Sequence, residues 1–466
     1  MVLAEQAAIY NEPLQLLRGR RILLTVCGGV AAYKAAALAS LLTRQGALVR
    51  TALTAAAQRF VAPLTFSALT GQPTVSEMWE RPDKLEPTAH VAWADWAEAL
   101  VTAPASADFV AKLAHGLADD WPSTAALAFS GPRLTAPAMN ASMYLNPATA
   151  DNLALLARRG HRVLSAPEGR LACGASGPGR LAEPEIIALE TARLLSAGPL
   201  RGQKVVVAGG ATREPWDDIR FLSNRSSGRF GSALALAAWL LGAETVLLAG
   251  PGAAEPPGPL EGLTVARFET CQDLLDQVLA RLDGAWALVM NAAPADFRPA
   301  QRVQGKIKKS EKTPSLPLIR TPDILKSVRA RKGSTLMVGF AAEDATEEGE
   351  RARRARRKLE DKGLDYVAAN QAGGPDSAFG AETVAVRLLA AEGWEKAVGP
   401  CSKFAAAWSL WGTIAATEAA KAGRGAAAEG VVDAKKPSAG QAEGAQAARR
   451  AKGSGRATGG RTGRGR

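Results

Sequence analysis

The sequence has few of the residues that build metal centres and disulfide frameworks. Its 466 residues include four cysteines and three histidines, and no two cysteines form a Cys-x-x-Cys pair. Neither a zinc site nor a disulfide scaffold is therefore expected. No apolar run approaches the roughly 20 residues of a membrane-spanning helix, and the N-terminus lacks a signal-peptide pattern. These absences predict a cytoplasmic protein without a membrane partner.

Acidic residues are scarce at one end of the chain. The formal net charge is +12, but residues 435–466 carry nine Lys and Arg against one Glu, which leaves +4 for the rest. This segment is rich in Gly, Ala and Arg and has almost nothing to bury, so residues 423–466 are predicted to be a disordered basic tail. Such tails attract polyanions without sequence preference. A solvated appendage with no specific nucleic-acid partner is the simpler interpretation.

The remaining composition, 47% hydrophobic and 22% charged, is typical of a soluble globular protein, and the length predicts two domains. Short apolar runs alternate with segments of helical spacing, a pattern that predicts two Rossmann-like, doubly wound parallel α/β sheets. The pattern restarts after a linker at 196–202 and predicts domains at 1–198 and 199–422. Strands are expected at 22–26, 47–53, 99–102, 133–135, 205–208, 245–248 and 287–290, and a helix at 31–45.

A glycine-rich segment at 169–180 carries a single thiol, Cys173. Its four glycines and one proline predict a mobile loop. Glycine lets such a loop close over a ligand, and the arginines near its two ends can hold an anionic one. A lid with one thiol is suited to deliver a proton inside a closed site. The alternative is a surface turn that happens to contain cysteine.

Small and polar residues follow the first three strands expected in the first domain. Gly28 and Gly29 end the first strand and open a helix, an arrangement that places backbone N–H groups around a phosphate. A Gly-x-Gly-x-x-Gly fingerprint is absent, which favours a mononucleotide over NAD. Thr54 follows the second strand and can add a hydroxyl to the same phosphate. Ser106 follows the third, at the sheet edge where open α/β folds bind ligands.

Two further polar residues are candidates for chemistry in this domain. Asn140 follows the fourth strand and offers both a donor and an acceptor to a ligand, or alternatively caps the next helix. His90 precedes the third strand. Its near-neutral imidazole suits a general base, although a lone histidine is more often structural.

These residues belong to motifs that occur in a recognisable order. The motifs are Cys-Gly-Gly-Val-Ala-Ala-Tyr-Lys (27–34), His90, Pro-Ala-Ser-Ala-Asp (104–108), Pro-Ala-Met-Asn-Ala-Ser-Met-Tyr (137–144) and the Ala-Cys-Gly of the glycine-rich loop. Over residues 18–195 the chain resembles the flavin-dependent phosphopantothenoylcysteine decarboxylases. The resemblance implies bound FMN, a base at His90, a carboxylate-binding amide at Asn140, and a flap on which Cys173 protonates the enethiolate left by decarboxylation. FMN contacts are expected from Gly28, Gly29, Thr54, Ser106 and Met139.

Two positions depart from that family's pattern. Cys27 stands where the family usually has Ser or Thr, and Ala175 stands where an acidic residue often follows Cys-Gly. The first departure concerns a flavin contact. The second leaves the acidity of the flap thiol without an explanation from the sequence.

The second domain has its own concentration of phosphate-binding residue types. Gly-Gly-Ala-Thr-Arg-Glu-Pro (209–215) follows a strand, and residues 220–231 place Ser, Gly and nearby arginines at a helix start. A nucleotide site and a merely capped helix both give this pattern. Asp296 at a strand end is suited to Mg²⁺ or a ribose. The lysines within 306–309 either neutralise a triphosphate or an oxyanion, or form a solvated face.

A second resemblance rests on six motifs in order: Gly-Gly-x-Thr-Arg-Glu-Pro, Ser-Asn-x-Ser-Ser-Gly, Asn-Ala-Ala-x-Ala-Asp, Lys-Ile-Lys-Lys, Pro-Asp-Ile-Leu and Gly-Phe-Ala-Ala-Glu. Over residues 202–420 the chain is similar to the CTP-using, bacterial phosphopantothenate–cysteine ligases. The resemblance implies that CTP activates the substrate carboxylate as an acyl-cytidylate, which cysteine's amine then attacks. Asn224 would orient the acyl group and Lys306 would stabilise charge on it. CTP contacts are expected from Ala292, Asp296, Lys306, Pro322, Asp323, Ile324, Leu325, Phe340, Lys358 and Lys362, with Asp296 also a candidate Mg²⁺ ligand.

Here too the sequence departs from its family. Thr321 replaces the Asn usual before Pro-Asp-Ile, and Gly305 replaces the Glu usual before Lys306. Lys358 and Lys362 are alternatively exposed charges on a basic helix at 351–362.

The whole chain thus resembles the bifunctional enzymes of coenzyme A synthesis that join both activities. The expected substrates are 4′-phosphopantothenate, cysteine and CTP, and the expected assembly is a trimer-based homo-oligomer of up to twelve subunits. Two other functions stay open from the sequence. One is a flavin-binding regulatory protein that keeps the fold without turnover, and the other is a general nucleotide-dependent oxidoreductase.

Overall fold

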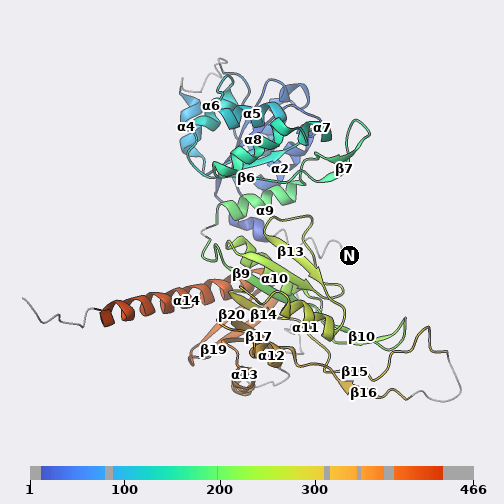
Figure 1. Cartoon of the computed structure of the whole chain (residues 1–466). Coiled ribbons are helices and arrows are strands. Elements are labelled where there is room, and N and C mark those ends of the chain that lie inside the picture. Colours follow the sequence, from blue (N-terminus) through green and yellow to red (C-terminus); the bar gives the residue numbers. More distant parts are fainter. Residues whose placement is uncertain are drawn as a thin grey trace, which may run out of the picture. The chain divides into compact units, whose positions relative to one another are not determined.

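The computed structural model describes residues 12–78, 88–196, 198–308, 315–343, 348–371 and 383–433. The chain divides into two compact units, Met1–Ala416 and Thr417–Arg466. Both α/β sheets lie in the first unit (Figure 1). Among the described residues, no helix combines the length and apolarity needed to cross a membrane.

The first sheet has six parallel strands in the order β3-β2-β1-β4-β5-β6. Its strands are β1 (Arg21–Val26), β2 (Leu48–Leu53), β3 (Thr74–Val75), β4 (Ala99–Ala105), β5 (Arg133–Pro137) and β6 (His161–Val163). Alternate residues of β1 face opposite ways, so that Leu24 packs in the cluster that includes α2, and Leu23 packs with Trp93 and Trp121. Helices therefore cover both faces, as the sequence predicts, and the strand order reverses between β1 and β4.

The helices of this part include α2, which lies where the sequence predicts a helix at 31–45. They are η1 (Glu12–Leu17), α2 (Ala32–Arg44), η2 (Ala57–Arg59), α3 (Pro63–Thr70), α4 (Ala89–Trp96), α5 (Ala107–His115), α6 (Trp121–Ala128), α7 (Ala141–Tyr144), α8 (Pro147–Arg158) and α9 (Pro184–Leu194). The segment predicted as a mobile loop differs from the prediction. Its flanks pair as two short antiparallel strands, β7 (Glu168–Arg170) and β8 (Ser176–Pro178), which leave only the turn around Cys173 without regular structure.

The second sheet has eight strands in the order β13-β12-β9-β14-β17-β18-β19-β20. They are β9 (Lys204–Gly209), β12 (Glu244–Ala249), β13 (Leu263–Arg267), β14 (Ala287–Met290), β17 (Leu336–Glu343), β18 (Tyr366–Gln371), β19 (Thr383–Ala390) and β20 (Glu395–Ser402). The strands up to β18 are parallel, but β19 and β20 run antiparallel to their neighbours. The predicted parallel sheet is thus confirmed up to β18 and ends in an antiparallel edge, where the turn between β19 and β20 is too short for the crossover that parallel neighbours need.

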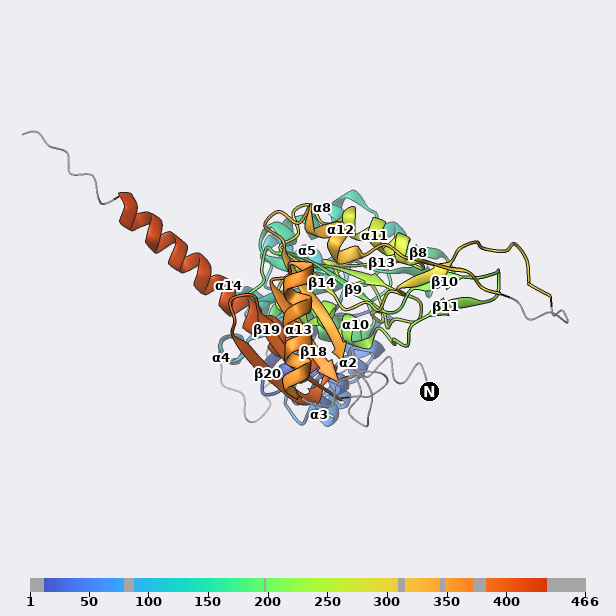
Figure 2. The ribbon, with the colours of Figure 1, turned by 90° about the horizontal axis from the view of Figure 1, so that it is seen from below.

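Helices cover both faces of this sheet as well. Val207 packs in the cluster that includes α10, whereas Val206 packs in the cluster that includes α11, and Figure 2 shows α13 against β18. The helices are α10 (Arg229–Leu240), α11 (Cys271–Leu279), α12 (Ile324–Arg329), α13 (Glu348–Lys362) and α14 (Lys403–Asp433). Helix α14 runs through 423–433, the first part of the segment predicted to be disordered, and residues 434–466 lie outside the described residues.

Two short antiparallel pairs stand apart from the large sheets. They are β10 (Arg213–Pro215) with β11 (Phe221–Ser223), and β15 (Phe297–Pro299) with β16 (Leu318–Arg320). Both lie at the same end of the second sheet (Figure 1). They matter for the site because they carry the segments that follow β9 and β14.

The N-terminus of α10 lies unusually close to β9. A Cβ built on Gly231 would lie 2.6 Å from the Cα of Gly209, a distance that no side chain tolerates. Only glycine at both positions allows the helix to start this near the strand. The first turn of α10 is thereby brought to the carboxyl end of β9, beside the point where the strand order reverses between β9 and β14.

Candidate functional site

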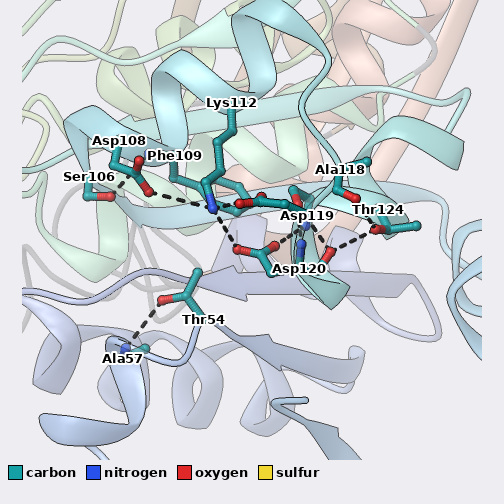
Figure 3. Close-up of polar contacts among 11 residues, drawn as sticks. Thr54, Ala57, Ser106, Asp108, Phe109, Lys112, Ala118, Asp119, Asp120 and Thr124 are labelled. Carbon is teal, nitrogen blue, oxygen red and sulfur yellow. Dashed lines mark hydrogen bonds and ion pairs between the residues drawn. The ribbon is translucent and has the colours of Figure 1, made fainter. Parts of the chain in front are cut away.

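The predicted flavin contacts lie at the carboxyl ends of β1, β2 and β4. A Cβ on Gly28 would lie 2.5 Å from the Cβ of Ala56, whereas a Cβ on Gly29 would meet nothing within 4 Å. Thr54 Oγ1 accepts a hydrogen bond from Ala57 N (3.2 Å), and Ser106 Oγ caps α5 by accepting one from the N–H of Phe109 (3.3 Å; Figure 3). Each hydroxyl keeps its own hydrogen to donate. Open space at Gly29 beside two such hydroxyls fits the phosphate of a mononucleotide.

Cys27 is a neighbour of this pocket rather than part of its surface. It is buried, and its thiol hydrogen-bonds with Ser106. Burial raises the pKa of Cys27 to about 12 despite that hydrogen bond. The thiol is therefore neutral at physiological pH, and its hydrogen bond with Ser106 helps to hold the segment after β4.

A charged cluster follows Ser106 on α5. The ammonium of Lys112 lies 2.8 Å from Asp119, 3.1 Å from Asp120 and 3.8 Å from Asp108 (Figure 3). These carboxylates raise the pKa of Lys112 although its partial burial opposes the shift. Because three carboxylates surround one lysine, its charge is already neutralised and is not available to an anionic ligand.

Asn140 and Cys173 are brought together. Asn140 Nδ2 donates to Cys173 Sγ at 3.3 Å, and its Oδ1 accepts from Ser142 N at 2.8 Å and so caps α7. Asn140 therefore caps α7, while its role as a ligand-binding amide stays a prediction. The hairpin is anchored nearby, because Met139 N donates to Gly179 O at 2.9 Å. Met139 as a predicted FMN contact, Asn140 as the predicted substrate amide and Cys173 as the predicted flap thiol thus lie close together.

His90 is not brought to this pair within one chain. It lies in the first turn of α4 and is half-buried. Helix α4 and the β7–β8 hairpin lie on opposite sides of their domain (Figure 1). The base predicted from the sequence and the predicted proton donor therefore face different regions of this subunit.

The second sheet carries a cavity of about 800 Å³ at the carboxyl ends of β9 and β14. It gathers Asn224 and every predicted CTP contact except Lys306: Ala292, Asp296, Pro322, Asp323, Ile324, Leu325, Phe340, Lys358 and Lys362. Six Lys and Arg side chains and two carboxylates line it, which gives a net charge of +4. A cavity of this charge suits a polyanionic ligand of the size of a nucleoside triphosphate.

Short contacts fix the walls of this cavity. Asn224 Nδ2 donates to Pro294 O (2.9 Å), and Thr321 Oγ1 donates to Ala295 O (2.6 Å). The ring of Phe340 meets that of Phe230 edge-on, with centroids 5.3 Å apart. Thr321, where the family usually has Asn, therefore has a structural partner of its own in the segment after β14.

The two lysines of α13 are not merely exposed charges. Lys358 Nζ donates to Phe340 O at 2.6 Å, and Lys362 forms an ion pair with Asp323. Asp323 also caps α12 by accepting from Lys326 N. Burial raises the pKa of Asp323, but the hydrogen bonds from Lys362 and from Lys326 N and the charges of both lysines together outweigh burial, so the pKa is lowered. The alternative of a simple solvated face is therefore wrong for Lys358 and Lys362.

Asp296 is the weaker part of the predicted site. Its side chain is exposed and lines the cavity. Among the described residues, no group of three or more His, Cys, Asp or Glu is placed to hold a metal ion. A single carboxylate suits Mg²⁺ only where substrate phosphates supply most of its other ligands.

Lys306 lies outside the residues that line the cavity, in a loop held by two aspartates. Asp218 Oδ2 accepts from Gly305 N at 2.7 Å, and Asp217 Oδ2 accepts from Ile307 N at 3.1 Å. The peptide groups on both sides of Lys306 are thus fixed while its side chain stays exposed. Lys309, the last lysine of this run, lies outside the described residues.

Arg220 also helps to hold the loop that carries Lys306. Its guanidinium donates to Asp217 Oδ2 through Nε (2.9 Å) and Nη2 (2.6 Å), and Nη2 also reaches Ile307 O (3.0 Å). Hydrogen bonds from Arg220, foremost, and from backbone N–H groups hold the pKa of Asp217 well below its usual range. A permanently ionised carboxylate therefore ties the Lys306 loop to the segment that precedes Asn224.

Several residues that line the cavity were not predicted as contacts; they include the polar side chains of Arg229, Arg320, Asn370 and Lys403. Arg229 and Arg320 lie inside or next to quoted motifs. Asn370 and Lys403 come from β18 and the start of α14, far from any motif, so no pattern could have indicated them.

Comparison with known proteins accounts for both halves of the chain. Residues 10–196 match the Flavoprotein family model, and residues 200–417 match the DNA/pantothenate metabolism flavoprotein C-terminal domain. The coenzyme A biosynthesis bifunctional protein CoaBC of Bacillus subtilis is 39% identical over 405 residues, covering 86% of this chain and 98% of the relative. The chain belongs to the CoaBC family.

A second relative supports the same assignment. CoaBC of Mycobacterium tuberculosis H37Rv is 41% identical over 398 residues, with 82% of this chain and 93% of the relative covered. A crystal structure of the C-terminal domain of a CoaBC protein aligns at 29% identity and a TM-score of 0.39, covering 47% of this chain and 98% of that chain. CoaBC membership confirms the predicted bifunctional decarboxylase–ligase of coenzyme A biosynthesis and lends no support to the regulatory alternative.

Proposed function

We propose that this CoaBC protein makes 4′-phosphopantetheine from 4′-phosphopantothenate and cysteine in two steps. Residues 199–422 would ligate cysteine to the substrate carboxylate, and residues 1–198 would decarboxylate the product. The observation that carries the first step is the cavity of net charge +4, and the one that carries the second is the Asn140–Cys173 contact. The tail from residue 423 has no assigned role in either step.

In the ligase step, the cavity would bind CTP with the triphosphate near the first turn of α10. The substrate carboxylate attacks the α-phosphorus, pyrophosphate leaves, and an acyl-cytidylate forms. The amine of cysteine then attacks the acyl carbon and CMP leaves. Asn224, held by Pro294 O, would orient the acyl group. Asp296 would help to hold Mg²⁺, which would offset the negative charge of the triphosphate.

Lys306 would stabilise the charge that develops on the acyl group. Its exposed side chain on an anchored loop requires either a swing of the side chain or a neighbouring subunit to reach the nucleotide. Gly305 next to it leaves that turn without the acidic side chain that the family usually has there.

In the decarboxylase step, the pocket at Gly29, Thr54 and Ser106 fits the phosphate end of FMN. FMN, when bound, would supply the oxidation of the substrate thiol that gives the departing carboxylate an electron sink. Asn140 would hold that carboxylate through its amide. Cys173 would protonate the carbon left after CO₂ departs, and His90 would remove a proton in the first step.

The separation of His90 from the Asn140–Cys173 pair supports an assembly of several subunits. Helix α4 of one chain would face the β7–β8 hairpin of another, so that each decarboxylase site is completed between subunits. This is consistent with the trimer-based homo-oligomer of up to twelve subunits expected from the family. Light scattering on the purified protein tests the subunit number.

The experiment that tests the function supplies CTP, Mg²⁺, cysteine and 4′-phosphopantothenate and follows CMP, CO₂ and the final thiol. Wild type is expected to form all three, with a yellow flavin spectrum and no oxidation of NAD(P)H. Cys173→Ser should release CMP and CO₂ but accumulate the unreduced enethiol product. Cys401→Ser, which changes a thiol outside both sites, is the matched control. Normal formation of 4′-phosphopantetheine by Cys173→Ser would refute the assigned role of the flap thiol.

A further inference from the structure

Lys403 is a buried cation without a counterion. It is the first residue of α14, it is 6% exposed, and it lines the cavity of the second sheet. Within the described parts of the chain, its ammonium has no hydrogen bond and no ion pair. A positive charge on a side chain this largely buried destabilises the folded protein unless an anion compensates it.

The charges around Lys403 indicate which kind of group would pair with it. Burial lowers the pKa of Lys403, the positive charge of Arg229 lowers it further, and no carboxylate opposes these two effects. Of the two carboxylates in the cavity, Asp323 is already paired with Lys362. Lys403 therefore adds an unpaired positive charge beside Arg229 in this part of the cavity.

Helix α10 adds to the same region. Arg229 is its first residue, and Gly228 at the N-cap position offers no side chain to the free N–H groups of the first turn. The amino end of a helix carries partial positive charge and binds phosphates through such N–H groups. Lys403, which lies far from α10 in the sequence, is therefore close to the amino end of α10, the end that favours an anion.

We propose that Lys403, together with Arg229 and the first turn of α10, binds the polyphosphate of the nucleotide. This inference rests on the proposed CTP-dependent ligase step and adds a contact that no motif indicates. The residue would contact the β- and γ-phosphates, which leave as pyrophosphate, rather than the cytosine or the ribose. Its burial without a partner then lowers the stability of the ligand-free protein and favours binding of a strongly anionic ligand.

The test compares Lys403→Met and Lys403→Arg with the wild-type full-length protein. Dissociation constants for CTP, CMP, cytidine, tripolyphosphate and 4′-phosphopantothenate are measured by calorimetry. Lys403→Met should weaken binding of CTP and tripolyphosphate by about 10- to 100-fold, CMP by less, and cytidine not at all. Lys403→Arg should restore most of the loss. Lys396→Met, an exposed lysine of β20 outside the cavity, is the control and should behave as wild type.

Thermal unfolding gives a second readout that a merely structural lysine would not produce. Without ligand, Lys403→Met should melt at a higher temperature than wild type, and with saturating CTP the order should reverse. Unchanged CTP affinity, equal loss of cytidine binding, or a loss confined to 4′-phosphopantothenate would each overturn the proposal. If wild type binds tripolyphosphate through Lys403 but does not prefer CTP, the ligase function fails and the polyphosphate site stands.

Discussion

Two glycine-to-alanine substitutions in helices should have opposite effects. Gly231 is the third residue of α10, and Gly412 lies on an exposed face of α14. By helix propensity alone, alanine is favoured over glycine by about 1 kcal/mol at each position. Packing distinguishes them. A Cβ at Gly231 would lie 2.6 Å from the Cα of Gly209, whereas a Cβ at Gly412 meets nothing within 4 Å.

The magnitude follows from that distance. Carbon atoms pack at roughly 3.5–4.0 Å, so α10 must retreat from β9 by about 1 Å. Overpacking against a rigid backbone costs about 3 kcal/mol at the upper end of its usual range. After the gain in propensity, Gly231→Ala should be destabilised by about 2 kcal/mol, while Gly412→Ala should be stabilised by about 1 kcal/mol. The two variants should differ by about 3 kcal/mol.

Urea unfolding followed by circular dichroism measures the difference as midpoints that move in opposite directions from wild type. CTP binding supplies the functional readout, because retreat of α10 displaces the N–H groups of its first turn. Gly231→Ala should therefore bind CTP more weakly, and Gly412→Ala should bind it normally. If both variants are stabilised alike, the close approach of α10 to β9 does not govern this part of the fold.

Three further substitutions or conditions test other parts of the structure. Asp217→Asn should lower ligase turnover by about 10- to 100-fold with little change in the KM for CTP, because the Lys306 loop loses its charged anchor; a change in KM alone would contradict this. Asn140→Ala should abolish decarboxylation, whereas Asn146→Ala, which removes a similar helix cap on α8, should only reduce stability; equal decarboxylase activity in the two variants would contradict the site. Because burial raises the pKa of Cys27 to about 12, stability should fall as pH rises from 9 towards 12, and Cys27→Ala should flatten that part of the stability–pH curve.

Much of the fold could be predicted from local patterns. The apolar runs that become β1 and β9 are buried on both faces, and such strands are recognisable because most of their residues are hydrophobic. The strands β17–β20 were not among those predicted. In β19 buried and exposed residues alternate at first, so that strand has no continuous apolar run, and the antiparallel direction of β19 and β20 depends on a turn rather than on the strands themselves.

The site was predictable where residues follow strands. Asn140 comes soon after β5, and parallel strands bring such loops to one edge of the sheet. Asn224 follows β11 of a short antiparallel pair and lines the cavity of the second sheet. Cys173 could be recognised from its glycine-rich surroundings, although its contact with Asn140 depends on how the hairpin folds back. Lys403 could not be recognised, because a single lysine acquires significance only when its helix packs and buries it.

The first six strands of the second sheet repeat the order of the first sheet: β13-β12-β9-β14-β17-β18 corresponds to β3-β2-β1-β4-β5-β6. Cys-Gly-Gly after β1 and Gly-Gly after β9 are therefore spatial counterparts, although the two halves share no recognisable repeat in sequence. Their different chemistries reside in the connections rather than in the sheets. An engineer who wished to exchange nucleotide preference could graft loops between equivalent strand ends and leave both hydrophobic cores untouched.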